Sequence, residues 1–459
     1  MSDIFDLIVL GGGPAGYLAA ERAGHAGLKT LLIEKRNVGG VCLNEGCVPS
    51  KTLLNSAKIY DYALHGDKYG VSVKGASIDQ KAVIERKNKV VKMLVSGIKG
   101  ALKANKVTLV DGLGMINSKD KDGFSVSVGD TVYKGKKLIV STGSEPVVPP
   151  IDGLKDGLAN GFVLTNREVL DLTTIPESFV VIGGGVIGLE MASYYNSVGS
   201  KVTVIEMLDH IAGPTDLEIS AMLQKAYADK GVDFKLSCKV VKVTKDSVVY
   251  EQDGKQVAVK AAKVLLSIGR RAVTQGFGLE NAGVMIERGA IVTDEKGCTN
   301  VSGLYASGDV NGKSMLAHTA YRESEVIINN ITGKKDTMRY GAIPAVIYTA
   351  PEVGAVGETE ETAKAKGIDF VVGKVSMLYS GRFVAENEGG DGICKVLFDK
   401  KSKRLIGCHM IGSYASEFII AAGIMVEKEM RIDEIKEVVF PHPTVCEIIR
   451  EAVFAVKEI

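Results

Sequence analysis

At 459 residues with a net charge of +1, the chain is long enough for about two to four domains and carries no excess of charge. The balance of 56 basic against 55 acidic residues excludes a polybasic surface for nucleic acid or anionic lipid. No apolar run approaches the roughly 18 residues of a membrane span. The N-terminus MSDIFDLIVL lacks the features of a secretory signal, and most of the seven cysteines are scattered, so we expect a cytoplasmic protein.

The first predicted elements are a strand, a glycine turn, a helix and a second strand. The apolar run FDLIVL precedes Gly11, Gly13 and Gly16, YLAAERAGHAG has helical character, and KTLLIE ends the second strand at Glu34. In this βαβ context the glycines allow a tight turn, close approach of the backbone to a pyrophosphate, and close packing of helix on strand. A pyrophosphate would bind at the N-terminus of the helix, and Glu34 is placed to accept a ribose hydroxyl.

Two cysteines, Cys42 and Cys47, stand in the next stretch, GGVCLNEGCVPSK. A disulfide closing so short a loop would stabilise the chain by only about 2 kcal/mol. The further cysteines of an iron–sulfur pattern are missing, so we predict no metal, and free structural thiols stay an alternative. On a regular helix the two Cα atoms would lie about 8 to 9 Å apart, too far for a disulfide.

A bond between the two cysteines therefore requires Cys42 to lie in a turn or in a distorted first helical turn, which Gly39 and Gly40 permit. The helix would then continue through SKTLLNSAKIYDYAL. A thiolate near the N-terminus of that helix would have a lowered pKa and be a better nucleophile. The stretch therefore fits a disulfide that opens and closes.

The βαβ pattern returns in the stretch FVVIGGGVIGLEMASYYNSVGSKVTVIE. Gly183, Gly185 and Gly188 repeat the glycine turn, and Glu206 repeats the terminal acid. One such motif can be only a turn, but two copies with matching acids predict two dinucleotide sites. The Glu206 carboxylate would repel the extra phosphate of NADP by about 4 kcal/mol per charge pair at about 4 Å. Residues 207–209 include no Arg, so we expect NAD(H) at the second site.

The stretch FPHPTVCEIIREAVFAV near the C-terminus places His442 between two prolines, just before a predicted helix. Thr444 and Glu447 fit a capping box, T-x-x-E. In the alternative, Glu447 bonds one imidazole nitrogen so that the other can take a proton from a thiol. A lone His is more often structural, and only the thiol pair makes this one a candidate base.

Together these stretches resemble the flavin-dependent pyridine nucleotide–disulfide oxidoreductases, and within that family the members that oxidise dihydrolipoamide. The similarity runs from end to end, through LIVLGGGPAGY, EKRNVGGVCLNEGCVPSK, STGSEP, VIGGGVIGLE, SIGRR, LYASGDV, MLAH and HPTVCE. It implies FAD at the first glycine turn and NAD at the second. Val41, Cys446 and the segments RRAVT and AHTAYRE depart from the commoner family pattern but involve none of the thiols, His442 or the glycine turns.

The resemblance also implies roles for individual residues. Cys42 would exchange with the substrate, Cys47 would lie against the flavin, and Lys51 would sit near flavin N5. His442, supported by Glu447, would serve the disulfide of the partner subunit in a homodimer. Glu190 would meet the nicotinamide and pair with Lys51. The implied FAD contacts are Gly11, Gly13, Gly16, Glu34, Lys51, Gly114, Thr142, Gly143, Ser144, Asp309, Met315, Leu316, Ala317 and His318, and the implied NAD contacts are Gly183, Gly185, Ile187 as a gate, Gly188, Glu190, Glu206, Val240 and Gly269. For the hydrophobic members a core position is the alternative.

We therefore expect an α/β fold with two Rossmann-like dinucleotide-binding domains, for FAD and NAD, and a C-terminal α/β dimerisation domain. The FAD-binding domain would begin with residues 1–145, which carry the redox disulfide and an inserted helix, ERKNKVVKMLVSGIKGALKAN. The NAD-binding domain would span 146–270, a second FAD-binding segment 271–337, and the interface domain 338–459. In the interface domain, ICKVLFD and RLIGCHMIG suggest strands.

The expected reaction is the NAD+-dependent oxidation of dihydrolipoamide carried by a lipoyl-bearing protein of a 2-oxoacid dehydrogenase or glycine cleavage complex. A glutathione reductase would use NADPH and be expected to carry basic residues at the positions after Glu206. A mercuric reductase would be expected to end in a paired-Cys tail where this chain has VFAVKEI. A non-catalytic flavoprotein scaffold subunit of a multienzyme complex is the alternative from another class. We expect no nucleic acid partner and no membrane association.

Overall fold

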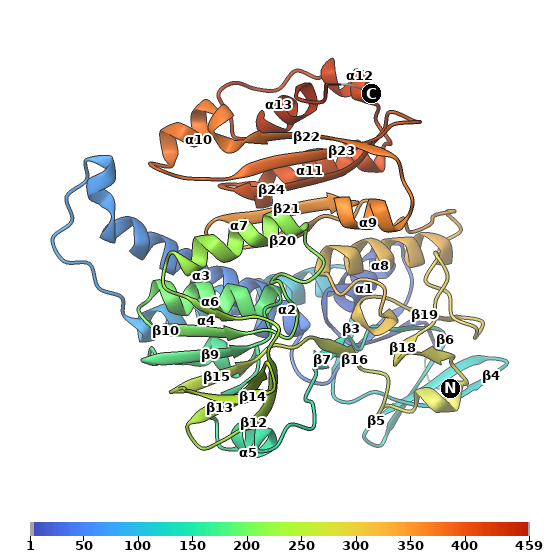
Figure 1. Cartoon of the computed structure of the whole chain (residues 1–459). Coiled ribbons are helices and arrows are strands. Elements are labelled where there is room, and N and C mark those ends of the chain that lie inside the picture. The colour runs from blue at the N-terminus through green and yellow to red at the C-terminus, as the bar shows by residue number, and fades with distance from the viewer. Residues whose placement is uncertain (1–3, 458–459) are drawn as a thin grey trace. The chain divides into compact units, whose positions relative to one another are not determined.

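The computed structural model of the chain describes residues 4–457, which form two compact units. The first unit contains the described residues up to 52 together with 85–147 and 269–339. The second contains 53–84, 148–268 and the described residues from 340 onward. Figure 1 labels many of the helices and strands of both. The domain boundaries expected from the sequence stay a prediction.

The first unit is built on a seven-stranded sheet of order β3-β2-β1-β6-β5-β4, in which β19 also pairs with β6. Strands β1, β2, β3 and β19 pair in parallel within it, and β4, β5 and β6 form an antiparallel meander. The central strand is apolar on both faces because both are buried, as in sheets covered by helices. The strands are β1 (Ile4–Leu10), β2 (Thr30–Glu34), β3 (Thr108–Asp111), β4 (Met115–Asp120), β5 (Gly123–Val128), β6 (Thr131–Val140) and β19 (Leu304–Ala306).

Two helices of this unit, α1 (Pro14–His25) and α8 (Ala317–Ile331), lie against each other although they are far apart in sequence; the Ser324 hydroxyl donates to the carbonyl of Ala15, 309 residues away. Helix α4 (Gln80–Ala104) confirms the helix expected from ERKNKVVKMLVSGIKGALKAN. The shorter elements are α2 (Gly40–Glu45), β7 (Ser144–Pro146), β16 (Arg270–Ala272), η3 (Leu279–Ala282), β17 (Ile286–Glu287), β18 (Ala290–Ile291) and η4 (Asp309–Asn311). Helix α3 (Cys47–Leu64) follows α2 after one residue.

The second unit contains a parallel five-stranded sheet of order β11-β10-β9-β15-β8. Phe179 and Tyr195 stack with ring centroids 4.4 Å apart, and the buried Tyr195 hydroxyl donates to the carbonyl of Val169 at 2.7 Å. A three-stranded antiparallel sheet, β12-β13-β14, lies in the same unit. These elements are η1 (Gly66–Tyr69), α5 (Leu154–Ala159), β8 (Val163–Leu164), η2 (Glu168–Asp171), β9 (Ser178–Ile182), α6 (Val186–Ser197), β10 (Lys201–Ile205), α7 (Leu217–Ala228), β11 (Asp233–Lys235), β12 (Lys239–Val243), β13 (Ser247–Gln252), β14 (Lys255–Lys260) and β15 (Lys263–Leu266).

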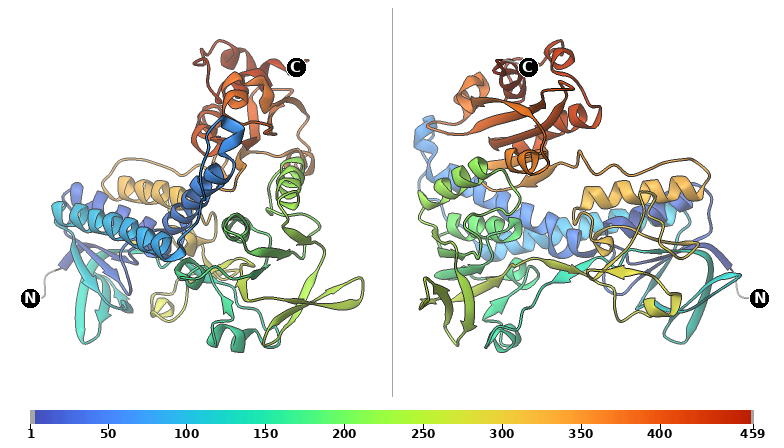
Figure 2. Two further views of the ribbon diagram at one scale, coloured as in Figure 1. Left: turned by 90° about the vertical axis from the view of Figure 1, so that its left-hand side faces the viewer. Right: turned by 45° about the vertical axis from the view of Figure 1, so that its right-hand side comes forward.

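The C-terminal part of the second unit is an antiparallel sheet of order β20-β21-β24-β23-β22, orange to red in Figures 1 and 2. Side chains alternate between its faces: Cys394 and Val396 join the core with α11 and α13, whereas Lys395 points to the opposite face. Strands β23 and β24 confirm the two segments expected from the sequence. The elements are β20 (Ala345–Ile347), β21 (Glu352–Gly357), α9 (Glu360–Ala365), β22 (Phe370–Ser376), η5 (Met377–Tyr379), α10 (Gly381–Glu386), β23 (Ile393–Asp399), β24 (Leu405–Gly412), α11 (Ala415–Glu427), α12 (Ile432–Lys436) and α13 (Ile448–Phe454).

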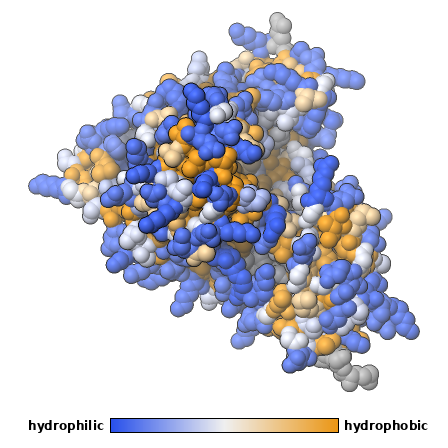
Figure 3. Space-filling view, turned by 60° about the horizontal axis from the view of Figure 1, so that its bottom comes forward, coloured by the Kyte–Doolittle hydropathy of each residue, from blue (hydrophilic) through white to orange (hydrophobic). Residues whose placement is uncertain are grey.

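The predicted fold class is confirmed, because two sheets with parallel βαβ units are followed by an antiparallel sheet covered by helices. On the face shown in Figure 3, apolar areas are interspersed among hydrophilic residues. Within residues 4–457, no helix has both the length and the apolar character that crossing a membrane requires.

One ion pair of the first unit makes stability depend on pH. Arg322 on α8 donates to both carboxylate oxygens of Asp336, at 2.9 and 2.6 Å, and Asn329 donates to the same carboxylate at 2.7 Å. The hydrogen bond from Arg322 is the largest cause that lowers the pKa of Asp336, from 3.8 to about 2. Because the folded pKa is the lower one, this stabilisation is complete above about pH 4 and is lost as the pH falls toward 2.

We predict that Arg322→Met lowers the free energy of unfolding by about 1 kcal/mol at pH 7, since the pair is only partly shielded from water. Urea unfolding followed by circular dichroism measures the difference, which should shrink steadily between pH 4 and pH 2.5. Lys400→Met is the control, because Lys400 pairs with the largely exposed Asp369 and should change stability little. A difference that stays constant down to pH 2.5 would contradict the assignment.

Candidate functional site

The first glycine turn connects β1 to α1, and two of its glycines cannot be replaced without a clash. Gly11 has φ +99°, and a Cβ there would lie 2.2 Å from the carbonyl oxygen of Ser141. A Cβ on Gly16 would lie 1.7 Å from the carbonyl oxygen of Gly11. Gly13 caps α1, and the nearest atom to a Cβ there is 3.8 Å away, so the space above it is open. An open helix N-terminus of this kind can bind a phosphate group.

The second glycine turn, between β9 and α6, repeats this geometry. Gly183 has φ +104°, and its Cβ would lie 2.3 Å from the carbonyl oxygen of Ser267. A Cβ on Gly188 would lie 2.3 Å from the carbonyl oxygen of Gly183. Gly185 caps α6, and no atom lies within 4 Å of where its Cβ would be. Both turns therefore have room for a pyrophosphate at a helix N-terminus.

Each turn is fixed to the acid at the end of the next strand. Glu34 accepts from the backbone N–H of Gly12 at 2.6 Å and from that of Arg36 at 2.7 Å. Glu206 accepts from Gly184 at 2.6 Å and from Leu208 at 2.8 Å. Each carboxylate keeps further lone pairs, so each can also accept hydroxyls of a ribose. The turns and acids identified in the sequence thus form two equivalent cradles.

The residues expected around FAD lie at the carboxyl edge of the first sheet and beyond it. Gly114 packs closely there, because a Cβ would lie 2.6 Å from Leu10 and 3.2 Å from Ile33. Thr142 donates to the carbonyl of Val273 at 2.7 Å, and Gly143 has φ +72°. The remaining members, Met315, Leu316, Ala317 and His318, lie just before and at the start of α8, and Met315 and His318 are exposed.

Asp309 is held by Ser144, which is itself held by Arg270, a residue that the sequence did not identify. The Ser144 hydroxyl donates to the Asp309 carboxylate, and Arg270 donates to the Ser144 hydroxyl and carbonyl, both at 2.7 Å. Because Arg270 lies 126 residues from Ser144, no local motif could reveal the contact, although SIGRR marked the region. Arg270 thus orients the carboxylate of Asp309 through Ser144.

A break between two helices brings the two thiols together. Helix α2 ends at Glu45, Gly46 has the non-helical angles φ −151° and ψ −112°, and α3 begins at Cys47. Cys42 therefore lies in a short separate helix, and its thiol forms a hydrogen bond with that of Cys47. The sequence predicted a turn or a distorted first helical turn for Cys42, whereas the structure places it in the separate helix α2; the predicted helix that follows is confirmed as α3.

The environment treats the two thiols differently. The hydrogen bond with Cys47, together with burial, raises the pKa of Cys42 far above its usual range, while the positive charge of Lys51 acts in the opposite direction. Cys47 is the first residue of α3, where the helix dipole stabilises a negative charge. Negative charge on the thiol pair is therefore favoured at the N-terminus of α3.

Two tyrosines near the thiols were not identified from the sequence. The hydroxyls of Tyr17 on α1 and Tyr321 on α8 hydrogen-bond to each other. Burial is the main cause that raises the pKa of both, and charge on Cys42 contributes to both shifts. Tyr17 directly follows the glycine motif, which was the one available signal, whereas Tyr321 is 304 residues away. The two hydroxyls thus belong to the electrostatic surroundings of the thiol pair.

His442 and Glu447 form a dyad in the second unit. The imidazole Nδ1 lies 3.0 Å from the Glu447 carboxylate, which is buried, whereas the His442 side chain is 78% exposed. The capping-box interpretation of Glu447 is wrong, because α13 begins only at Ile448 and the Thr444 hydroxyl donates instead to the carbonyl of Pro441. With Nδ1 held by the carboxylate, Nε2 is the atom that can accept a proton.

The remaining residues expected around NAD differ in burial and in the unit to which they belong. Glu190 on α6 is buried and accepts from the backbone N–H of Tyr348 at 3.2 Å, and Ile187 is 37% exposed near the start of the same helix. The Val240 side chain is part of a hydrophobic core, so only its backbone could line a pocket. Gly269 has φ +114° and belongs to the first unit. The pairing of Glu190 with Lys51 joins residues of different units and stays a prediction.

Comparison with known proteins accounts for nearly the whole chain. Residues 5–324 match the family described as pyridine nucleotide-disulphide oxidoreductase, and residues 343–453 match the dimerisation domain of the same family. A dihydrolipoyl dehydrogenase of Mycoplasma genitalium is 37% identical over 97% of this chain and 97% of its own length. A mitochondrial dihydrolipoyl dehydrogenase of Pisum sativum is 38% identical over 99% of this chain and 92% of its own length. Among solved structures, the Cu(II) complex of the HOCl-induced flavoprotein disulfide reductase RclA from Escherichia coli has a TM-score of 0.87 and 26% identity, covering 99% of this chain and 100% of that one.

The two glycine turns predict separable losses of cofactor. In Gly16→Ala the new methyl group would meet the carbonyl of Gly11, so the purified protein should lose most of its bound flavin, measured by absorbance at 450 nm. In Gly188→Ala the flavin should stay while NADH binding, measured by fluorescence titration, weakens at least tenfold, about 1.4 kcal/mol.

The control is Gly97→Ala on α4, where no atom lies within 4 Å of the added methyl group and both ligands should bind normally. Loss of both ligands in each of the two turn variants would contradict the assignment of one dinucleotide to each turn.

Proposed function

Because the chain belongs to the pyridine nucleotide-disulphide oxidoreductase family, we propose that it oxidises protein-bound dihydrolipoamide with NAD+ through FAD and a Cys42–Cys47 disulfide. It is an NAD-dependent flavoprotein disulfide oxidoreductase, and relatives from several organisms are dihydrolipoyl dehydrogenases. The observation that carries the proposal is the hydrogen-bonded thiol pair at the break before α3, within reach of the charge on Lys51.

The thiol pair accounts for the first half of the reaction. One thiolate of the substrate attacks the sulfur of Cys42 in the oxidised pair, the Cys42–Cys47 bond breaks, and Cys47 leaves as a thiolate. The second substrate thiol then attacks the substrate sulfur that is bonded to Cys42. The disulfide of lipoamide forms, the bond to Cys42 breaks, and Cys42 leaves as a thiol. The substrate has lost two electrons and two protons. In the reduced pair, Cys47 would carry the negative charge, because it is the first residue of α3, and Cys42 would keep a proton.

The His442–Glu447 dyad supplies the base. Nε2 takes the proton from a substrate thiol, which is needed near neutral pH because only the thiolate attacks. Glu447 fixes the tautomer through Nδ1 and stabilises the imidazolium that forms. We propose that the dyad of one subunit serves the thiol pair of the other in a homodimer. The match of residues 343–453 to a dimerisation domain supports this arrangement.

The two cradles hold the cofactors that the second half requires. FAD, when bound, would supply a two-electron carrier between the reduced thiol pair and NAD+. The chain contributes Glu34 and Glu206 as acceptors for the two riboses and two helix N-termini for the pyrophosphates. Glu206 would disfavour a 2′-phosphate, which supports NAD+ over NADP+.

The lipoyl group would come from another protein. We propose a lipoyl-bearing protein of a 2-oxoacid dehydrogenase or glycine cleavage complex as the partner and the cytoplasm as the location. The names of the relatives support the substrate class, since they are dihydrolipoyl dehydrogenases.

The proposal predicts that the purified flavoprotein reduces NAD+ with dihydrolipoamide and is much slower with NADP+. Cys47→Ser should hold flavin but lose both this activity and the long-wavelength absorbance that appears when dihydrolipoamide is added to the wild type, because that band requires a thiolate against the flavin. Stopped-flow absorbance measures both properties. A protein that instead reduces glutathione disulfide with NADPH, and not NAD+ with dihydrolipoamide, would overturn the proposal.

For the dyad we predict that His442→Gln lowers kcat about 10² to 10⁴-fold with flavin content unchanged, the range expected for a lost general base. Glu447→Gln should lower kcat less, because the imidazole remains but loses its fixed tautomer. The matched control is His65→Gln, which removes another exposed imidazole paired with a carboxylate and should turn over normally. Near-normal turnover of His442→Gln would reduce His442 to a structural residue.

A further inference from the structure

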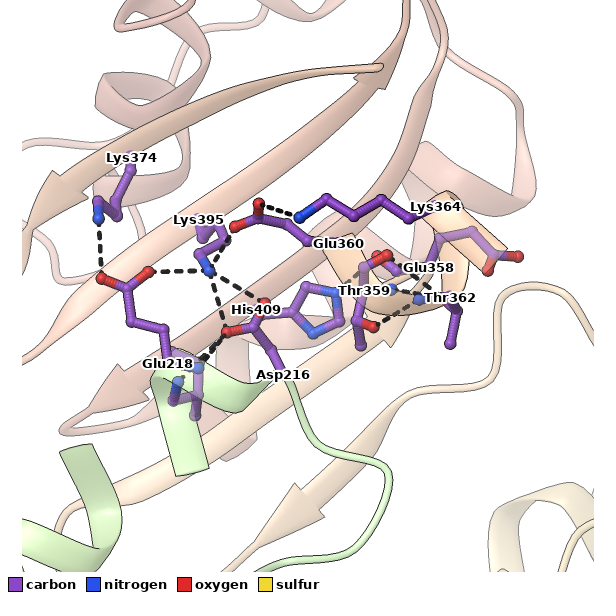
Figure 4. A network of polar contacts seen from close by, with 11 residues as sticks. Asp216, Glu218, Glu358, Thr359, Glu360, Thr362, Lys364, Lys374, Lys395 and His409 are labelled. Carbon is purple, nitrogen blue, oxygen red and sulfur yellow. Dashed lines mark hydrogen bonds and ion pairs between the residues drawn. The ribbon is translucent and has the colours of Figure 1, made fainter. Parts of the chain in front are cut away.

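A buried lysine in the second unit is surrounded by three carboxylates. Lys395 on β23 is 2% exposed, and its ammonium lies 3.0 Å from both oxygens of Asp216, 2.9 Å from Glu218 and 2.8 Å from Glu360. The four side chains come from the start of α7, the start of α9 and the middle of the C-terminal sheet (Figure 4). One cation thus joins three separate parts of the chain.

The charges in this cluster depend on one another. Burial lowers the pKa of Lys395, but the hydrogen bonds that its ammonium donates to Glu218, Glu360 and Asp216 outweigh burial and hold the pKa above the usual value. Lys374 also pairs with Glu218, at 2.8 Å, but from a position that is 49% exposed. Removing Lys395 would leave Asp216, which is fully buried, without its cation. Uncompensated buried charge is strongly unfavourable, so the start of α7 would have to move.

Asp216 has a second role that fixes the direction of α7. It is the N-cap of this helix, and its Oδ1 accepts from the backbone N–H groups of Glu218 and Ile219 at 3.1 and 3.2 Å. The same oxygen accepts from Lys395. The first turn of α7 is therefore attached to β23 through one carboxylate.

The loop of residues 207–215, the ribose loop, links Asp216 to the second cradle. Its residue Ala212 donates its backbone N–H to the carbonyl of Gly184 at 2.8 Å, and Ile211 is buried in the core. Ser220 in the first turn of α7 donates to the carbonyl of Ile211 at 2.8 Å. Two adjacent residues of the loop, Ile211 and Ala212, thus contact the first turn of α7 and the glycine turn, respectively.

We propose that Lys395 is a positioning residue for NAD+ binding, which acts by fixing Asp216 and, through the ribose loop, Gly184 and Glu206. The inference rests on the proposed function, because it takes the second cradle to be the NAD+ site. Lys395 itself does not touch the nucleotide in this account. Its effect should therefore appear in the affinity for NAD+ and not in the chemistry of the thiols.

The test compares Lys395→Met with Lys374→Met in the full-length flavoprotein. Lys395→Met should raise both the KM for NAD+ and the Kd for NADH about tenfold, because small displacements of positioning groups are costly. Its flavin content, and the absorbance change on adding dihydrolipoamide without NAD+, should match the wild type. Lys374→Met removes a cation from the same Glu218 and should leave NADH binding within about twofold of the wild type, the size expected for an exposed pair.

Two further variants keep the test decisive. Lys395→Arg keeps the charge and should bind NADH more tightly than Lys395→Met. If Lys395→Met fails to fold, Asp216→Asn replaces it, since Asn still caps the helix but loses the charge that Lys395 holds, and it should weaken NADH binding in the same direction.

The outcomes separate the inference from the proposed function. If the wild type failed to bind NADH, the proposed function would be overturned before any variant is compared. If the wild type binds NADH but Lys395→Met and Asp216→Asn bind it equally well, the inference is overturned. If Lys374→Met weakened NADH binding as much as Lys395→Met, the inference would also be overturned, because loss of either positive charge near Glu218 would then have the same effect.

Discussion

The contact between the sulfur atoms of Cys42 and Cys47 is the interaction on which the proposed chemistry depends. An unbroken helix would hold these residues about 8 to 9 Å apart at Cα, beyond the span of a disulfide. Gly46 interrupts the helix between the two cysteines. Its non-helical angles separate α2 from α3 and let Cys42 approach Cys47. The same break makes Cys47 the first residue of α3, so geometry and electrostatics are set by one backbone feature.

The cofactor cradles repeat a single physical solution. In each, a glycine with positive φ begins the turn, a second glycine lies against the carbonyl of the first, and an acid accepts from the turn 22 residues earlier. The second copy differs in its surroundings, because the ribose loop ties it to α7 and so to Lys395. Identical turns can thus be supported by different parts of the fold.

Features that are local in the chain could be predicted from the sequence, and features that join distant segments could not. The glycine turns, their acids and the thiol pair each occupy one short stretch, so spacing alone indicated their geometry. The contacts of Tyr17 with Tyr321 and of Lys395 with Asp216 span 304 and 179 residues, and no motif marks them. A local pattern was also misleading once, because Glu447 fits a capping box but bonds His442 instead. The homodimer and the pairing of Lys51 with Glu190 stay predictions.

Peptide mapping by mass spectrometry tests the central claim most directly. After mild oxidation of the flavoprotein, the account predicts one disulfide, between Cys42 and Cys47, with the other five cysteines still reactive toward an alkylating reagent once the chain is denatured. One equivalent of dihydrolipoamide added without NAD+ should convert that bond, and no other, to two thiols. A protein that holds flavin but never yields this disulfide would contradict the account.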